Sequence, residues 1–322
     1  MRALVVRALS DDLSGVGLVE VPAPRRYPGQ LLVRVRAAAL NHPDLLMTRG
    51  TYQLQPPLPF ALGMEMAGQV LEADPDSGFA RGDRVVAGTR TGSFADLVVV
   101  DASAARRLPD GIDWARGAAI GVAYLTAHVA LVALGGLKPR DWVLVHGATG
   151  GVGLAAADLA QALGARVIAT SRSPLKLGIV ASDLPLHGRL PADDFRGAVT
   201  TLTNGGADLV FDPVGGDVFD QSTRCIAHGG RLLVVGFASG RIASLPTNVA
   251  LIKGFSVIGV RAGEHGRRNP AAGRAAADAV WDLAARGLIR PRLHAIHPLD
   301  DWRQAFDDMA AARHVGKLVL EP

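Results

Sequence analysis

The chain has 322 residues, of which 49% are hydrophobic and 20% charged, so it is long enough for two domains with a full apolar core. Its formal net charge is only +4 and its arginines are scattered, which argues against a nucleic-acid-binding surface. The single cysteine, Cys225, excludes an internal disulfide and a thiolate metal site. The first residues do not resemble a signal peptide, and no apolar run approaches the roughly 18 residues of a membrane span, so we expect a cytoplasmic protein.

Short strand-forming runs fill the first third of the chain. They are separated by Gly, Pro and Asp and lie at residues 1–6, 17–24, 30–40, 67–74, 84–88 and 93–101. This pattern predicts a mostly antiparallel β domain with partial barrel character. Residues 41–60 interrupt it, and their polar, proline-rich composition predicts a long loop.

From about residue 113 the pattern changes to alternating helices and strands. Residues 114–134 are predicted to form a helix with Asp113 as its N-cap. Strands are then expected at 141–147, 165–171, 207–216, 231–237 and 256–260, with helices at 151–164, near Pro174 and at 217–230. Such alternation predicts a parallel sheet covered by helices on both faces. The end of the chain is predicted as two helices and a strand.

The strongest local signal is the stretch VLVHGATGGVGL, residues 143–154, where a strand run meets a helical run. It contains Ala148-x-Gly150-x-x-Gly153, a dinucleotide-binding pattern with alanine at its first glycine position. Small residues let the backbone approach a pyrophosphate, and the new helix offers free N–H groups to that anion. We therefore expect a dinucleotide site at Ala148, Thr149, Gly150, Gly151 and Val152.

The second strand of this region indicates which dinucleotide binds. A protein that prefers NAD usually has an Asp or Glu about 20 residues after the turn, where it binds the ribose hydroxyls. The stretch VIATSRSPLK has no acid there and instead carries Ser171, Arg172 and Lys176. A hydroxyl and two cations suit a 2′-phosphate, so we expect NADPH. The alternative is that Arg172 and Lys176 are only the polar start of a helix.

The order of these features resembles the medium-chain dehydrogenase/reductase superfamily, and most of all its zinc-independent NADPH:quinone oxidoreductases, the zeta-crystallin group. The resemblance runs nearly end to end and is carried by AAALNHPDLLMTRGTY, PPLPFALGMEMAGQV, GDRVVAG, VLVHGATGGVGLAAADLAQALGARVIA, FDPVGGDVF, GGRLLVVGFASG and VGKLVLEP. It implies an α/β fold with a GroES-like irregular β-barrel catalytic domain at residues 1–122 and 262–322. A Rossmann doubly wound parallel-sheet domain, which binds NADP(H), is implied at residues 123–261.

The resemblance also bears on metal binding. In the zinc alcohol dehydrogenases of this superfamily, a Cys in the loop and a His in a Gly-His-Glu element hold the catalytic zinc. Here Asn41 stands at the Cys position and Met64 at the His position, and neither is a good zinc ligand. We therefore expect no metal, and we expect Glu65 to be buried and hydrogen-bonded within the β domain. Without a Lewis acid, hydride transfer requires an acceptor that is already activated.

By position, the resemblance implies further site residues. Asn41 and Tyr52 are expected to face the nicotinamide and the substrate, with Tyr52 bonding the acceptor carbonyl or donating a proton. The alternative for Tyr52 is an aromatic that packs the loop, and Asp44 is expected to order that loop. Thr126, Gly236, Phe237 and Lys317 are expected to contact the cofactor, although a packed strand end is an equal alternative for Lys317.

The predicted function is NADPH-dependent, zinc-independent reduction of a quinone or an α,β-unsaturated carbonyl compound. Two alternatives stay open: an enoyl-thioester (enoyl-CoA/ACP) reductase of the same superfamily, and a non-catalytic NADPH-binding structural or RNA-binding protein. Arg261 is either a contact for an anionic substrate or a surface arginine. The resemblance implies that residues 256–260, at the expected edge of the parallel sheet, pair two subunits into a homodimer.

Overall fold

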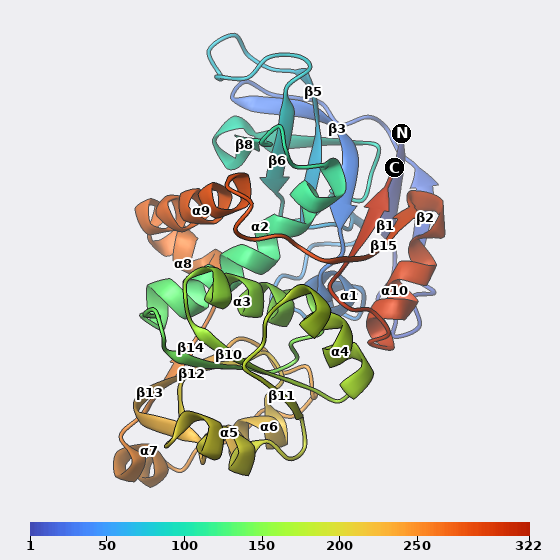
Figure 1. The fold of residues 1–322 in the computed structure, drawn as a ribbon. Coiled ribbons are helices and arrows are strands. Elements are labelled where there is room, and N and C mark those ends of the chain that lie inside the picture. Colours follow the sequence, from blue (N-terminus) through green and yellow to red (C-terminus); the bar gives the residue numbers. More distant parts are fainter. The chain divides into compact units, whose positions relative to one another are not determined.

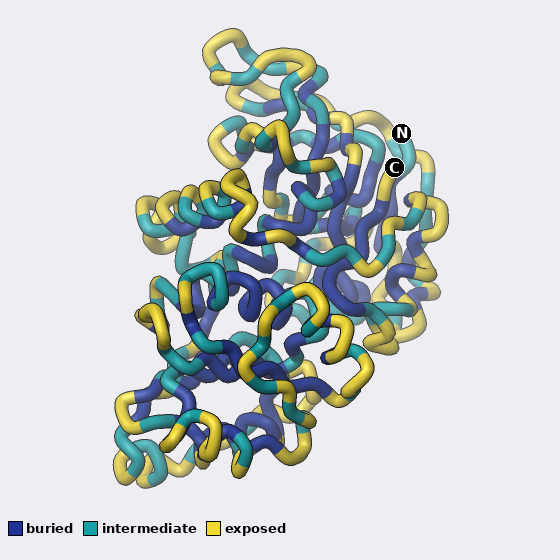
Figure 2. Tube along the Cα trace, in the orientation of Figure 1, coloured by how far each residue is buried: buried dark blue, intermediate teal, exposed yellow.

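A computed structural model describes residues 1–322. Contacts within the chain define two compact units: unit 1, residues 1–122 and 291–322, and unit 2, residues 123–290. Figure 1 follows the chain through both units, and Figure 2 shows that buried residues concentrate along the strands of each.

The second boundary between the units lies at residue 290, whereas the sequence placed it at residue 261. Helices α8 (Ala262–Arg268) and α9 (Pro270–Ala285) therefore belong to unit 2. The reason is their packing, because α8 contacts both α9 and the π-helical segment η2 (Val129–Leu134).

Unit 1 is built on two sheets. Its strands are β1 (Arg2–Val6), β2 (Val16–Glu20), β3 (Gln30–Ala39), β4 (Phe60–Ala61), β5 (Glu65–Glu72), β6 (Arg84–Gly88), β7 (Leu97–Asp101), β8 (Ala105–Arg107), β15 (Leu293–Pro298) and β16 (Lys317–Glu321). The smaller sheet has the order β2-β1-β4, and the larger has the order β15-β16-β3-β5-β6-β8, with β7 also paired to β3. Only the β15–β16 pair is parallel, so the predicted antiparallel domain is confirmed.

The core of unit 1 follows from the alternation of its strands. Along β3, Val33 and Val35 are buried whereas Arg34 and Arg36 are exposed, because successive strand side chains point to opposite faces. Helix α10 (Trp302–Ala310) adds aromatic side chains to this core, and the ring of Phe306 lies edge-on to Phe94. The short 3₁₀ turns η1 (Ala102–Ala104) and η3 (Leu299–Asp301) join neighbouring strands and helices.

The segment predicted as a loop contains a helix, α1 (His42–Thr48), so that prediction is wrong in its first half. Asn41 is the N-cap residue, and the carboxylate of Asp44 accepts a hydrogen bond from its backbone N–H at 2.8 Å. Pro43 falls in the first turn, where a missing N–H costs nothing. These start signals are present in the sequence, and the length of the surrounding polar segment obscured them.

Unit 2 contains one six-stranded parallel sheet with the order β11-β10-β9-β12-β13-β14. The strands are β9 (Trp142–Val145), β10 (Arg166–Ser171), β11 (Gly188–Pro191), β12 (Ala207–Asp212), β13 (Ile226–Val234) and β14 (Ser256–Gly259). Helices α3 (Gly151–Ala162), α4 (Pro174–Asp183), α5 (Arg196–Thr203), α6 (Gly216–Ser222) and α7 (Thr247–Lys253) alternate with them. If the six strands are numbered by their order in the chain, their order across the sheet is 3-2-1-4-5-6. This is the doubly wound arrangement, so the predicted Rossmann sheet is confirmed. In such sheets, ligands bind at the point where the strand order reverses.

The predicted helix at 217–230 is too long. Helix α6 ends at Ser222, and β13 already begins at Ile226. Cys225 therefore lies between them rather than in a helix, but it is buried as expected, and burial raises the pKa of its thiol to about 11. A thiol with a raised pKa is a poor nucleophile at neutral pH.

Helix α2 (Trp114–His128) continues into η2, and Asp113 caps its start by accepting a hydrogen bond from the N–H of Arg116. The combined stretch Trp114–Leu134 is long and apolar enough to cross a membrane by length and composition, so the expectation that no such run exists is wrong. However, 56% of the apolar window is buried inside the protein, which is also the behaviour of a core helix.

Candidate functional site

Three polar side chains meet in the interior of unit 1. Lys317, at the start of β16, is 5% exposed, and Glu65, at the start of β5, is 2% exposed. The ammonium nitrogen of Lys317 lies 3.0 Å from Oε1 of Glu65 and donates to Oδ1 of Asn41 at 2.7 Å. The sequence left two roles open for Lys317, a contact with the cofactor or a packed strand end. In the structure its amino group is hydrogen-bonded to two side chains of unit 1.

Both amide hydrogens of the Asn41 side chain are used in hydrogen bonds within the chain. Its Nδ2 group donates to Oε1 of Glu65 at 2.8 Å and to the carbonyl oxygen of Ala39 at 3.2 Å, so both amide hydrogens are used. Its Oδ1 accepts from Lys317 and keeps one further lone pair. Asn41 can therefore offer a bound molecule an acceptor but not a donor.

Glu65 is buried and hydrogen-bonded within unit 1, as the sequence predicted. Besides Lys317 and Asn41, it accepts a 2.7 Å hydrogen bond on Oε2 from the backbone N–H of Val122. The preceding turn requires glycine, because Gly63 has a φ of 104° and a Cβ there would overlap the backbone N of Phe94. Both carboxylate oxygens of Glu65 are thus hydrogen-bonded within unit 1.

Asp44 lies beside this cluster and is fully buried. Its Oδ2 accepts from the N–H of Asn41, as expected for a residue that orders this segment, whereas its Oδ1 has no hydrogen-bond partner. Burial raises the pKa of this carboxyl to about 7, although the N–H of Asn41 and the charge of Lys317 oppose the rise.

Tyr52, the other predicted catalytic residue, is half-buried and packs against the apolar core of unit 1. Its hydroxyl group has no hydrogen-bond partner within the chain, which leaves it available to a bound molecule. The packing alternative and the catalytic role are thus compatible, because the ring contacts the core while the hydroxyl remains unused.

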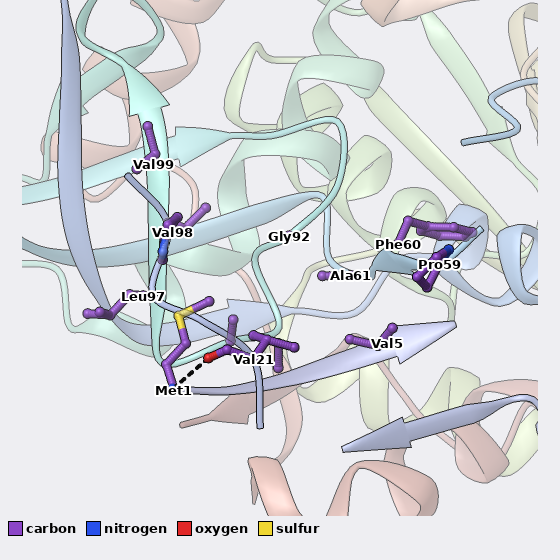
Figure 3. Close-up of a pocket in the computed structure, with 13 residues that line it drawn as sticks. Met1, Val5, Val21, Pro59, Phe60, Ala61, Gly92, Leu97, Val98 and Val99 are labelled. Carbon is purple, nitrogen blue, oxygen red and sulfur yellow. Dashed lines mark hydrogen bonds between the residues drawn. The ribbon is translucent and has the colours of Figure 1, made fainter. Parts of the chain in front are cut away.

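Unit 1 also has an apolar pocket of about 380 Å³, shown in Figure 3. Side chains such as Val5, Phe60 and Leu97 line it, and the terminal amino group of Met1 beside it donates to the carbonyl oxygen of Val21 at 2.9 Å. None of the predicted site residues lines this pocket. It lacks the convergent polar groups of a catalytic site.

In unit 2, the glycine-rich turn joins β9 to α3 as predicted. Gly147 has a φ of 57°, Gly150 is the N-cap of α3, and a Cβ on Gly153 would overlap the carbonyl oxygen of Gly147. The first turn of α3 carries no acidic side chain and begins with Gly151 and Val152. The N–H groups of this turn are therefore uncovered and suited to a pyrophosphate.

The end of β10 lies beside this turn. The N–H of Ala148 donates to the carbonyl oxygen of Thr170 at 3.1 Å, and the hydroxyls of Thr149 and Ser171 are 3.4 Å apart. Arg172 is exposed immediately after the strand, with Ser173 capping α4 behind it.

Arg172 and Lys176 are close enough to affect each other. Burial first, and then the charge of Arg172, lower the pKa of Lys176. An anion bound beside both side chains would relieve this repulsion, which fits a 2′-phosphate. The structure thus brings Thr149, Ser171, Arg172 and Lys176 to one edge of the sheet.

The ends of β12 and β13 contribute the next predicted residues. Gly236 and Phe237 follow β13, and the ring of Phe237, 45% exposed, lies beside Gly215 in the β12–α6 turn. Because the carboxyl ends of parallel strands meet at one edge, these residues share that edge with the glycine-rich turn. Asp212, which the sequence analysis missed, holds this turn by accepting the N–H groups of Val214 and Gly215.

A second residue missed from the sequence is His146, at the end of β9 directly before the glycine-rich turn. Its Nδ1 lies 2.8 Å from Oγ1 of Thr170 and its Nε2 lies 2.8 Å from Oγ of Ser222. Ser222 donates its own hydrogen to Val218, so it accepts from Nε2–H of His146, and Nδ1 accepts from Thr170. Burial lowers the pKa of His146 to about 3, which keeps the ring neutral. The ring ties β9, β10 and α6 together beneath the turn.

The contacts described above do not test the roles predicted for Thr126 and Arg261. Thr126 lies half-buried on α2, and Arg261 is exposed at the N-cap position of α8. Their assignments to the cofactor and to an anionic substrate stay predictions.

Comparison with known proteins gives the following similarities. Residues 27–110 match the alcohol dehydrogenase GroES-like domain, and residues 151–279 match the zinc-binding dehydrogenase family. The chain is 34% identical over 318 residues to quinone oxidoreductase-like protein 2 of Mus musculus, which covers 97% of this chain and 91% of the mouse protein. It is also 38% identical over 321 residues to a segment of a spectinabilin polyketide synthase system protein of Streptomyces orinoci, which covers 96% of this chain and 14% of that protein.

Among solved structures, the quinone oxidoreductase of Thermus thermophilus, described also in its complex with NADPH, superposes with a TM-score of 0.89 at 29% identity. The superposition covers 100% of both chains.

One of the matching families is described as zinc-binding, but the residues of this chain do not fit zinc. Asn41 and Met64 stand at the two positions where the resemblance implies zinc ligands, and neither side chain is a good zinc ligand. The ammonium of Lys317 lies 2.7 Å from Oδ1 of Asn41 and 3.0 Å from the carboxylate of Glu65. A second cation placed there would be repelled at close range. No group of three or more His, Cys, Asp or Glu side chains is placed to hold a metal ion.

Proposed function

The chain belongs to the quinone oxidoreductase family of the medium-chain dehydrogenase/reductase superfamily, and from this premise we propose that it is an NADPH-dependent reductase. The acceptor is a quinone or an α,β-unsaturated carbonyl compound, and the reaction needs no zinc. The observation that carries the proposal is the edge of the parallel sheet in unit 2. There, the N–H groups in the first turn of α3 are uncovered, and Thr149 in the β9–α3 turn lies beside Ser171. Arg172 and Lys176 follow Ser171, with no acid between them to repel a 2′-phosphate.

The residues of unit 2 would hold the cofactor in a defined order. The turn at Ala148, Thr149, Gly150, Gly151 and Val152 binds the pyrophosphate through the backbone N–H groups that open α3. The N–H groups of Ala148 and Gly150 shape the turn instead, because they donate to the carbonyl oxygens of Thr170 and Gly147. Ser171, Arg172 and Lys176 bind the 2′-phosphate by hydrogen bonds and charge. Gly236, Phe237 and Thr126 are assigned to the nicotinamide half. When bound, NADPH supplies the hydride.

The residues of unit 1 are assigned to the acceptor. The free hydroxyl of Tyr52 donates a hydrogen bond to the acceptor carbonyl, where negative charge develops as hydride arrives. Asn41 contributes only its oxygen, because both of its amide hydrogens are used. Quinones and enones suit this set, since each already contains an electron sink and needs no Lewis acid.

An enoyl thioester is the second candidate acceptor. The observation in its favour is the match to a polyketide synthase segment over nearly the whole chain. Arg261 would then face an anionic part of the substrate. We also propose a cytoplasmic homodimer, because β14 is an unpaired edge of the parallel sheet.

NADPH oxidation measured against benzoquinone, naphthoquinone, an enone, an acrylate and an enoyl-CoA tests the proposal. We expect turnover with the quinones or the enone, and a preference for NADPH over NADH. Faster turnover of enoyl-CoA than of every other acceptor would favour the second candidate. Tight NADPH binding without turnover of any acceptor would refute both.

A further inference from the structure

The burial and the hydrogen bonds of Lys317 in its cluster with Glu65 and Asn41 are inconsistent with a contact between this lysine and the cofactor. A lysine that contacts a bound cofactor needs an accessible ammonium, whereas Lys317 is 5% exposed and already donates to two side chains. Its two partners, Asn41 and Glu65, are 276 and 252 residues away in the chain. The last strand, β16, therefore places the ammonium beside side chains from the first part of the chain.

The electrostatics of the cluster depend on this cation. Glu65 is 2% exposed and would be an isolated buried anion without Lys317, which is strongly destabilising. Its other contacts, from Asn41 and from the N–H of Val122, are neutral donors. Lys317 therefore supplies the only positive charge in direct contact with Glu65.

The same cation fixes the orientation of Asn41. An amide can rotate by half a turn and exchange its oxygen and nitrogen with little change in shape. Here Lys317 requires an acceptor and Glu65 requires a donor, so the two charges on either side select one orientation. The remaining lone pair of Oδ1 is then the one polar feature that Asn41 can present to a bound molecule.

We infer that Lys317 is a positioning residue whose ammonium lies between Asn41 and Glu65, neutralises the buried carboxylate and fixes the orientation of the Asn41 amide. It holds Asn41 with its amide oxygen available and does not contact the cofactor. This inference rests on the proposed function insofar as Asn41 acts in the reductase reaction.

The test uses the full chain with Lys317→Met, Glu65→Gln and the double variant, and with Lys138→Met as the matched control. Lys138 is exposed, so its substitution removes the same charge without touching the cluster. Each cluster variant alone leaves a buried charge without its partner, and we expect the unfolding midpoint to fall by more than about 5 °C. The double variant removes both charges and should recover at least half of that loss. Midpoints that simply add would show that the two charges are not coupled and would overturn the inference.

The second readout separates positioning from cofactor contact. In the folded double variant, we expect the Kd for NADPH, measured by fluorescence titration, to stay within about threefold of wild type. The kcat with a quinone should fall by about tenfold or more, while the KM for NADPH changes little. A tenfold rise in the Kd for NADPH would make Lys317 a cofactor ligand, and an unchanged kcat would remove its positioning role.

Failure of the proposed function is distinguishable from failure of this inference. If wild-type protein binds NADPH but reduces no acceptor, the reductase proposal fails. The unfolding midpoints and the Kd for NADPH then still decide whether Lys317 is paired with Glu65 or bound to the cofactor.

Discussion

Lys317 and Glu65 form a buried ion pair of 3.0 Å that joins the start of the last strand to the start of β5. The pair explains why an acid stands alone in the apolar stretch LGMEMAGQV. Its partner is a lysine from the end of the chain, and Asn41 lies between them as an acceptor for one and a donor for the other.

Removing the cations beside Ser171 should reverse the preference for NADPH. Arg172→Ala and Lys176→Ala each remove a charge-assisted contact to the 2′-phosphate, so we expect the Kd for NADPH to rise by about tenfold to a hundredfold. The Kd for NADH should stay nearly constant, because NADH lacks this phosphate. The exposed Arg224→Ala is the control, and fluorescence titration measures each Kd. Equal losses for both dinucleotides would contradict the assignment.

Gly153→Ala should disrupt the dinucleotide turn. The new Cβ would overlap the carbonyl oxygen of Gly147, so the turn and the helix start must separate. We expect at least about tenfold weaker NADPH binding and a lower unfolding midpoint. Gly178→Ala in α4 is a matched control, because nothing lies within 4 Å of its added Cβ and alanine favours the helix. If both variants behave alike, close packing at Gly153 is not the cause.

Stability at mildly acidic pH should depend on His146. The pKa of His146 is about 3 in the folded protein, whereas an unperturbed histidine has a pKa of 6.5, so the unfolded chain binds the extra proton between these values. Stability from this group is complete above pH 6.5 and declines as pH falls, by about 2 kcal/mol between pH 7.5 and pH 5.0. Urea unfolding at both pH values should show a larger loss for wild type than for His146→Gln. An equal loss in both proteins would mean that His146 is not kept neutral by the fold.

The unpaired strand β14 should mediate self-association. Val257 on β14 is exposed, and on the neighbouring α7 Leu251 and Ile252 are 82% and 78% exposed. Val257→Lys should therefore convert a homodimer into a monomer in sedimentation velocity, because charge on an edge strand opposes pairing. Leu175→Lys, on the exposed face of α4, is the control and should leave the dimer intact. A wild-type monomer would refute the proposed dimer.

Much of the fold is predictable from the sequence because local signals agree with tertiary structure. The parallel sheet follows from alternating strand and helix runs, and the β9–α3 turn follows from the spacing of its small residues. Helix α1 was missed although Asn41, Pro43 and Asp44 carry ordinary start signals. The boundary after α6 was misplaced because the sequence through Cys225 continues a helical pattern that the strand β13 overrides.

The candidate site is only partly predictable. The sequence predicted that Glu65 is buried, but the lysine that pairs with it could not be found from the sequence. Lys317 lies 252 residues away, and nothing local distinguishes a lysine that contacts a cofactor from one that pairs with a buried acid. His146 was also missed, because its hydrogen bonds reach two other elements of unit 2.

The central claim is hydride transfer from NADPH to an activated acceptor without a metal. The most direct measurement uses NADPH carrying deuterium at the transferable position of the nicotinamide, an enone as acceptor, and a strong chelator in the buffer. We predict that the reduced enone carries one deuterium on the carbon β to the carbonyl and that the chelator leaves the rate unchanged. NADPH oxidation that places no deuterium in the product, or activity that the chelator abolishes and zinc restores, would contradict this account.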